Sequence, residues 1–252
     1  MLYFQDFGTL LYQFGDEKDT TIFQDISRYA DVIDQVKDDV SFLNYHTIQE
    51  GFRPDQVSLQ LYNSPNYYWT FYLLNDDIRL QGWPLPNGEL LEYIKKNYPN
   101  TTITVREPFA TKFKVGQTVT GGTSGASGVI LRRNLNLGHI VIEGDKSFTS
   151  SGELLQSTNS SGVVETVTSV SSSKEYLAAR HYIDSSSAIV DLSIDSSGSA
   201  TPGHLLPPGA LLTERTNEET EINVNRSLRT IKVIKPSLMP TLVSSYKRSI
   251  RA

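Results

Sequence analysis

The sequence contains no cysteine. Disulfide bonds, thiolate zinc sites, iron–sulfur clusters and cysteine nucleophiles are therefore excluded. Long apolar runs are missing as well, because no stretch approaches the ~18 consecutive apolar residues that a membrane-spanning helix needs. The first six residues have no basic segment and include Asp6, so we expect no secretory signal there. These features predict a soluble protein made in a reducing compartment.

Positive charge is in slight deficit. The 252 residues include 23 Lys and Arg against 28 Asp and Glu, a net charge of -5. Because clustered basic side chains supply much of the affinity for phosphate backbones, this balance argues against a generally basic nucleic-acid binder. Hydrophobic residues make up 38% and charged residues 20%, a composition outside the range of globally disordered chains. The length fits one large domain or two to three small ones.

Residues 1–44 are predicted to form an aromatic arm followed by a helix. Aromatic and leucine side chains crowd the first fourteen positions without a clean helical or strand period. Such an arm either packs on its own domain or docks on another subunit, and Phe4 and Phe7 are its candidate contact residues. From Thr20 onward, apolar residues recur with the period of a helix, at Ile22, Ile26, Tyr29 and Ile33. This spacing predicts an amphipathic helix.

Residues 45–110 are predicted to form a compact α+β unit. Residues 45–48 have the character of a short strand, and a short helix follows from Pro54, where a first helical turn tolerates proline. Residues 67–74 are apolar nearly all round and predict a second helix. Residues 78–80 would then return as a strand. The expected order of this unit is β-α-α-β.

The composition changes between residues 111 and 173, where Gly, Ser, Thr and Val dominate. Five short candidate strands are separated by turn signals, at residues 113–120, 128–133, 138–143, 154–157 and 163–171. Short strands at this spacing, with glycines between them, indicate a small antiparallel barrel or sandwich. Because mixed α+β character returns after it, this segment is interpreted as an insertion.

The last segment, residues 174–252, is mixed. Residues 182–183 and 189–192 flank a turn cluster and predict a hairpin. Near the end, Ile231 and Val233 alternate with polar neighbours as in a strand. Apolar residues then recur every four positions, at Leu238, Leu242, Tyr246 and Ile250. This stripe predicts a final helix.

No segment matches a catalytic or ligand-binding motif. The glycine-rich residues 121–128 lack both the lysine of a P-loop and the Gly-x-Ser-x-Gly spacing of a nucleophile elbow, so we expect a tight β-turn. The four histidines are scattered without metal-ligand spacing. Asp76 and Asp77 follow the second helix as an ordinary stop signal. The sequence therefore predicts no enzyme, no cofactor and no metal site.

Residues 45–83 resemble a LysM module, a fold often used to bind N-acetylglucosamine polymers. Residues 45–51 look like its opening strand and turn, and Leu74-Asn75 look like the end of its second helix. The Asp that LysM modules commonly place after the glycine of that turn is Phe52 here, which argues against glycan binding. A LysM-type peptidoglycan- or chitin-binding module is nevertheless the alternative function.

A closer resemblance is to the small baseplate wedge subunit of T-even-like contractile phage tails, whose core is itself LysM-like. It rests on four short motifs: Pro54, residues 62–69, residues 73–76 and Gly82-Trp83. The aromatic start and residues 226–236 with the last helix give weaker support. Coverage is roughly residues 1–105 and 174–252. The implied fold is α+β, with a LysM-like core, an N-terminal aromatic arm, an inserted small antiparallel β-barrel and a C-terminal strand plus helix.

The resemblance implies a structural role in the virion, at the tail baseplate, after assembly in the host cytoplasm. The subunit would join neighbouring wedges into the ring around the hub through contacts with other baseplate wedge proteins, and neither nucleic acid nor a membrane is expected as a partner. The candidate interface residues are Phe4, Phe7, Tyr67, Tyr68, Trp69, Asn75, Asp76, Trp83, Tyr246 and Ile250. For the aromatic residues, burial in the domain's own core is the competing interpretation.

Overall fold

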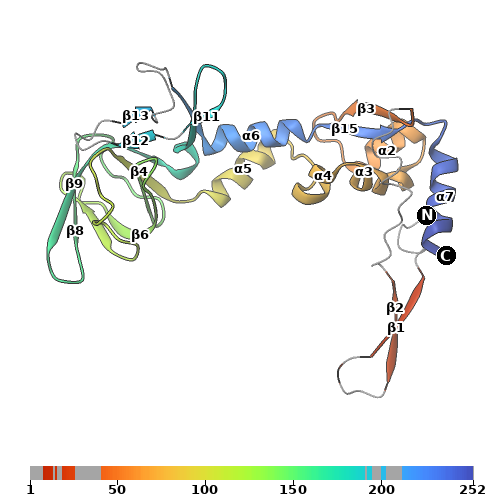
Figure 1. Cartoon of the computed structure of the whole chain (residues 1–252), viewed down its shortest axis with the longest axis horizontal. Coiled ribbons are helices and arrows are strands. Elements are labelled where there is room, and N and C mark those ends of the chain that lie inside the picture. Colours follow the sequence, from red (N-terminus) through yellow and green to blue (C-terminus); the bar gives the residue numbers. More distant parts are fainter. Residues whose placement is uncertain are drawn as a thin grey trace. The chain divides into compact units, whose positions relative to one another are not determined.

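The computed structural model describes residues 8–13, 15, 19–25, 41–190, 192–194, 200–202 and 212–251. These residues form helices and several small antiparallel sheets, so the predicted α+β class is confirmed. The chain divides into two compact units (Figure 1). The first unit comprises Met1–Asn87 and Val224–Ala252, and the second unit comprises Gly88–Asn223. The second unit is thus inserted in the sequence of the first.

The N-terminal arm contains an antiparallel hairpin. Strand β1 (Thr9–Gln13) pairs with strand β2 (Thr20–Gln24). The prediction of a helix from Thr20 is therefore wrong for residues 20–24, which form β2. The β-branched side chains there favour an extended backbone. The rest of that predicted helix lies outside the described residues, as do Phe4 and Phe7.

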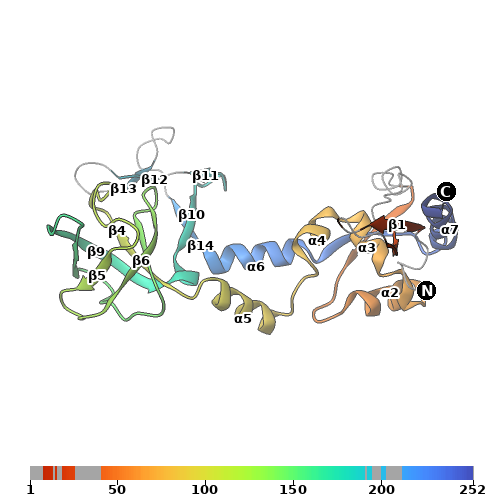
Figure 2. The same cartoon turned by 90° about the horizontal axis from the view of Figure 1, so that it is seen from below.

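The first unit is built around a two-stranded antiparallel ribbon. Strand β3 (Leu43–Thr47) pairs with strand β15 (Thr230–Ile234), which comes from the far end of the sequence. Helix α2 (Pro54–Tyr62), the 3-10 turn η2 (Pro65–Tyr67) and helix α3 (Trp69–Leu74) follow β3. In both Figure 1 and Figure 2, these helices lie beside the β3–β15 ribbon.

The strand predicted at residues 78–80 is wrong. Residues 78–80 belong to helix α4 (Asp76–Gln81). Asp76 and Asp77 occupy the first turn of this helix, where carboxylates are favoured by the helix dipole. The Asn-Asp-Asp sequence therefore ends one helix and begins another, and the strand that pairs with β3 is β15.

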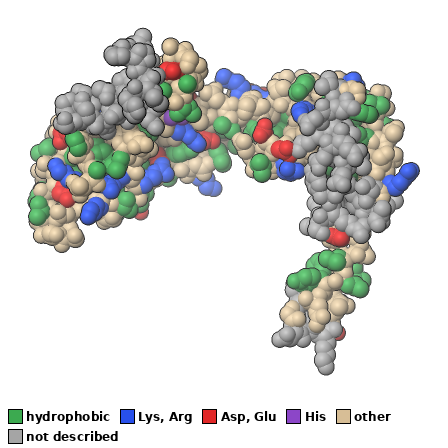
Figure 3. Space-filling view, in the orientation of Figure 1, with side chains coloured by type: hydrophobic (Ala, Val, Ile, Leu, Met, Phe, Trp, Pro, Cys, Tyr) green, Lys and Arg blue, Asp and Glu red, His purple; other side chains and the backbone are tan. Residues whose placement is uncertain are grey.

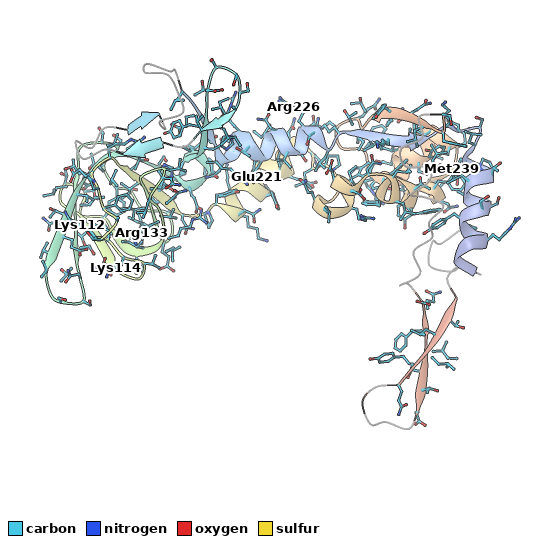
Figure 4. The ribbon with its side chains drawn as sticks, viewed as in Figure 1. Lys112, Lys114, Arg133, Glu221, Arg226 and Met239 are labelled. Carbon is cyan, nitrogen blue, oxygen red and sulfur yellow. The ribbon has the colours of Figure 1, made fainter. Side chains whose placement is uncertain are left out.

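Two apolar clusters fill the first unit. One joins β3, α3 and the C-terminal helix α7 (Met239–Arg251), whose first residue is labelled in Figure 4. The other joins α2, α3, α4 and β15, with buried residues Ile48, Val57, Phe71, Ile78, Leu228, Ile231 and Val233. The predicted apolar stripe of the last helix is confirmed for Leu242 and Tyr246, which are buried. Ile250 lies in α7, but its side chain is outside the described residues.

The second unit contains a closed barrel with the strand order β4-β7-β6-β5-β8-β9. The strands are β4 (Thr101–Val105), β5 (Thr118–Gly121), β6 (Ser127–Asn134), β7 (His139–Ile142), β8 (Leu154–Thr158) and β9 (Val164–Lys174). All neighbouring strands are antiparallel, in agreement with the small antiparallel barrel predicted from the sequence. Its first strand, β4, precedes the segment in which the sequence indicated strands.

The remaining elements of the second unit flank the barrel in sequence. They are α5 (Asn87–Asn97), η3 (Glu175–Leu177), β10 (Ala179–Ile183), β11 (Ile189–Val190), β12 (Leu192–Ile194), β13 (Ala200–Pro202), β14 (Thr213–Thr216) and α6 (Asn217–Ser227). The predicted hairpin is confirmed by the pairing of β10 with β11. Helix α6, which begins in the second unit and ends in the first, was not predicted. Within the described part of the chain, no helix is long and apolar enough to cross a membrane.

The glycine-rich residues 121–128 form the predicted turn, and its backbone donors bind an internal carboxylate. The N–H groups of Thr123 and Ser124 donate to Oε1 of buried Glu153, at 3.0 and 2.6 Å. The N–H of Thr149 donates to Oε2 at 2.7 Å. The turn thus resembles an anion-binding nest whose anion is a side chain of the same barrel.

We expect the barrel to lose stability as the pH falls below about 4.5, the ordinary pKa of its glutamates. Burial alone would raise the pKa of Glu153, but hydrogen bonds from Ser124, Thr149 and Thr123 lower it overall. The backbone N–H of Phe113 likewise lowers the pKa of Glu165. A carboxyl group with a lowered folded-state pKa contributes stability above its unfolded-state pKa, and this contribution is lost as the pH falls through the folded-state value.

Urea unfolding of the barrel at pH 6 and pH 3.5, followed by hydrogen exchange of barrel amides, measures this effect. The midpoint should fall at the lower pH, and the fall should be smaller in Glu153→Gln than in the parent protein. An equal pH dependence in the two proteins would contradict the role assigned to this carboxylate.

Candidate functional site

The aromatic pair Trp69 and Tyr246 lies in the core of the first unit. Their rings stack at 5.1 Å between centroids, with an interplanar angle of 27°. Only 7% of Trp69 and 2% of Tyr246 are exposed. Aromatic pairs of this kind stabilise a core beyond the area that they bury. These two predicted contact residues therefore hold α7 against α3 and do not present a surface to a partner in this conformation.

A second aromatic group links α2, α3 and the segment after α4. Tyr62 contacts Tyr67 edge-on at 5.9 Å, and Phe71 and Trp83 lie with their centroids 6.0 Å apart. The indole Nε1 of Trp83 donates to the backbone oxygen of Phe52 at 2.7 Å. Phe52 is the residue that departs from the LysM pattern, and in this chain its backbone helps to fix Trp83.

The Tyr62 hydroxyl connects this aromatic group to the ribbon. It donates to the backbone oxygen of Ile234 at 3.0 Å, and burial raises the pKa of Tyr62 well above its ordinary value. The phenol is therefore neutral and acts as a donor throughout the physiological range. Together, these contacts give Tyr67 and Trp83 structural roles, whereas Tyr68 remains 37% exposed.

Asn75 joins α3 to β15. Its Nδ2 donates to the oxygens of Phe71 and Lys232, at 2.8 and 2.9 Å, and its Oδ1 accepts from the N–H of Lys232 at 2.8 Å. The amide thus pairs with the strand much as a neighbouring strand would. Asp76 forms an ion pair with Arg79, at 2.7 Å between Oδ1 and Nη2. These contacts of the two predicted site residues lie within the first unit.

A cavity of about 360 Å³ adjoins Asn75 and Asp76. It is bounded by the start of α4, the end of α6 and the beginning of β15. None of its lining residues comes from the turn at Gly51. The groove expected of a glycan-binding LysM module, between the loop after the first strand and the end of the second helix, is therefore not formed by this cavity.

The β1–β2 hairpin exposes apolar side chains on both of its faces. Leu11 and Ile22 are cross-strand partners on one face, and 66% of each is exposed. Leu10 and Phe23 are partners on the opposite face and are also exposed. Figure 3 shows hydrophobic side chains at the surface of this hairpin. Since successive side chains of a strand alternate between faces, one covering surface cannot shield both pairs.

The exposed apolar residues of this two-faced hairpin are not among the contact residues expected from the sequence, which in this part of the chain are Phe4 and Phe7. The apolar residues from Ile22 onward recur with a spacing that also fits a helix. For this reason the strands of the hairpin were not predicted. The signal that favours the strand is local: Thr20, Thr21 and Ile22 are consecutive β-branched residues. Gly15, in the connection, adopts a positive φ of 53° that suits a turn between two strands.

No cluster of three or more metal-ligating side chains occurs among the described residues. No protein-family model matches the chain, and no curated protein sequence matches it.

Proposed function

We propose that this chain is a structural subunit of a contractile phage tail baseplate, where it joins neighbouring wedges through protein–protein contacts. The observation that carries the proposal is the hairpin with apolar side chains on both faces. An isolated two-stranded hairpin is marginal in water, and exposed apolar surface of this kind characterises interaction sites. The motifs in residues 54–83 and 226–236, which resemble the wedge subunit, supply the baseplate context.

Within this proposal, the first unit without its β1–β2 hairpin is a LysM-like platform, which we call the base. The pairing of β3 with β15 and the helices α2 and α3 between them in the sequence support this likeness, whereas the additional helix α4 departs from the β-α-α-β order. The buried Trp69–Tyr246 stack makes α7 part of the same base. A partner then meets the base through exposed residues such as Tyr68, and the hairpin reaches a neighbouring wedge.

The two faces of the hairpin suggest how it engages its partner. If both the Leu11–Ile22 pair and the Leu10–Phe23 pair become buried, the hairpin inserts into a cleft or between two subunits. Large apolar residues at the centre of such an interface are each worth about 2 kcal/mol or more, which corresponds to roughly 30-fold in affinity.

The experiment is a pull-down of the tagged full-length chain from cells that produce the other baseplate proteins of the same phage. We expect stoichiometric recovery of wedge proteins with the parent chain, and a reduction of at least about 30-fold in affinity with Leu11→Asp or Ile22→Asp. Thr20→Asp is the matched control, because it adds the same charge to the same face of β2 at a polar position.

The near-ultraviolet circular dichroism of all variants should match that of the parent, since none of these positions is buried. Recovery of no wedge protein by the parent chain would refute the assembly role. Equal recovery by the Leu11→Asp and Thr20→Asp variants would leave the assembly role standing but remove the hairpin from it.

The alternative is a peptidoglycan- or chitin-binding module, which would bind sugar in the cavity beside Asn75 and not in the groove that LysM modules use. The wall of this cavity includes Asn75, Asp76, Ser227 and Thr230, whose side chains offer polar groups of the kind that bind sugar hydroxyls. Sedimentation with insoluble peptidoglycan tests this function directly. Retention that is reversed by chitin oligomers, without recovery of wedge proteins, would favour glycan binding over assembly.

A further inference from the structure

The second unit contains a cavity of about 430 Å³ on the outside of the barrel. Thr102 of β4 and His139 of β7 contribute to its wall from the barrel. Glu175, Arg180 and Asn217 contribute from the segment that follows the barrel. Ile103, the neighbour of Thr102 in β4, belongs to the barrel core, so alternation along the strand places the Thr102 side chain outside it.

Basic side chains outnumber acidic ones around this cavity. Its charged lining residues are Arg132, Arg133, Arg180 and Glu175. Glu175 pairs with Arg132 and Glu221 pairs with Arg180, which leaves one net positive charge among these groups. Burial, with a smaller effect of nearby Arg106, lowers the pKa of His139 to about 4. The imidazole is therefore neutral at pH 7, and the positive charge of the cavity comes from guanidinium groups.

The three arginines are held in place by hydrogen bonds within the unit. Arg132 pairs with Glu175 through Nη2. Arg133, labelled in Figure 4, donates from Nη1 to the oxygen of Lys112 at 2.7 Å. Arg180 donates from Nη1 to Glu221 at 2.9 Å and to the hydroxyl of Tyr98 at 3.1 Å. A guanidinium group has five N–H donors, so each of these arginines retains donors beyond those bonds while its position is already fixed.

Thr102 supplies an independent indication of a ligand. The residue is 1% exposed, and its Oγ1 has no hydrogen-bond partner among the groups that the structure describes. Buried hydroxyl groups are rarely left unsatisfied, because burial without a hydrogen bond carries a free-energy cost. Thr102 lines the cavity, so a polar ligand bound there would supply the hydrogen-bond partner that its hydroxyl lacks.

We propose that this cavity binds a small oxyanion, through a carboxylate or phosphate group held by the arginines and by the Thr102 hydroxyl. Guanidinium groups match the planar, two-oxygen geometry of these anions. The cavity has room for a single monosaccharide-sized ligand, so the group can belong to a free ion or to an acidic sugar. This site is independent of the hairpin and of the proposed role in assembly.

Isothermal titration of the full-length chain tests the proposal with inorganic phosphate, D-glucuronate and, as the neutral control, glucose. We expect saturable one-to-one binding of at least one of the two anions, weakened by added salt, and no binding of glucose. Tighter binding of phosphate indicates a free oxyanion as the ligand, whereas tighter binding of glucuronate indicates an acidic saccharide.

Thr102→Val and Arg180→Gln should each weaken binding of the preferred anion by about tenfold. Thr118→Val, at an exposed position of β5, is the matched control and should bind like the parent. Thr102→Val removes an unsatisfied hydroxyl without changing the side-chain shape, so its melting temperature should not fall, which separates lost binding from lost folding.

Two results would overturn the proposal. One is the absence of saturable binding of either anion up to tens of millimolar. The other is binding that is unchanged in both Thr102→Val and Arg180→Gln.

Discussion

Trp69→Ala is expected to lower the free energy of unfolding of the first unit by about 3–5 kcal/mol, the usual cost of removing a large buried aromatic side chain. The side chain stacks on Tyr246 and packs in the cluster that joins α3 to α7. Its loss leaves a cavity beneath α7, so the C-terminal helix should detach before the rest of the unit unfolds.

Urea unfolding followed by tryptophan fluorescence measures this effect selectively. The chain contains two tryptophans, Trp69 and Trp83, and both belong to the first unit. Trp83 therefore remains as the reporter in the variant. Tyr68→Ala is the control, since this neighbouring aromatic side chain is partly exposed and its removal should cost less than about 1 kcal/mol. Similar unfolding midpoints for the two variants would contradict the assignment of Trp69 to the core.

Glu153→Gln is expected to destabilise the barrel by about 3 kcal/mol. Three backbone N–H groups, from Thr123, Ser124 and Thr149, donate to this buried carboxylate. An uncharged amide is a weaker acceptor, and its NH₂ group would face backbone donors if it occupied one of the two oxygen positions. At least one buried donor is then left without a partner.

Hydrogen exchange of barrel amides measures this loss in the second unit without interference from the first. Glu143→Gln is the matched control, because Glu143 is an exposed glutamate of the same barrel and should tolerate the change within about 0.5 kcal/mol. Gly121→Ala should act like Glu153→Gln, since an added Cβ would lie 2.3 Å from Oε1 of Glu153. Unchanged protection in Glu153→Gln would show that the turn at residues 121–128 is stable without the carboxylate.

The position of β15 affects how the first unit can fold. Residues 230–234 pair with residues 43–47 only after the second unit has been synthesised between them. Contacts of such high sequence separation form slowly, because the loop must close before the pairing is stabilised. The pairing of β3 with β15 therefore completes the first unit last, after the second unit has been synthesised.

The local sequence pattern by itself determined several elements. The turn signals and strand character around β6, β7, β8 and β9, and the four-residue spacing of Leu242 and Tyr246, are properties of short segments and predicted these elements correctly. The strand predicted at residues 113–120 is a strand only from Thr118, and β4 was not predicted. The nest at residues 121–128 was also predicted as a turn. In each case the periodicity of one element matches the side that it buries, so local information is sufficient.

Tertiary structure alone decided which segments meet. Residues 78–80 and 230–234 both had the character of strands. In the fold, the first belong to α4 and the second pair with β3, and Ile78, Ile231 and Val233 share one buried cluster. Tertiary structure also decided the positions of Trp69, whose side chain is buried because α7 returns to cover it, and of Thr102, Arg132 and Arg180, which line one cavity although they are far apart in the sequence. Contacts between distant segments depend on the free energy of the whole fold, and no local period carries that information.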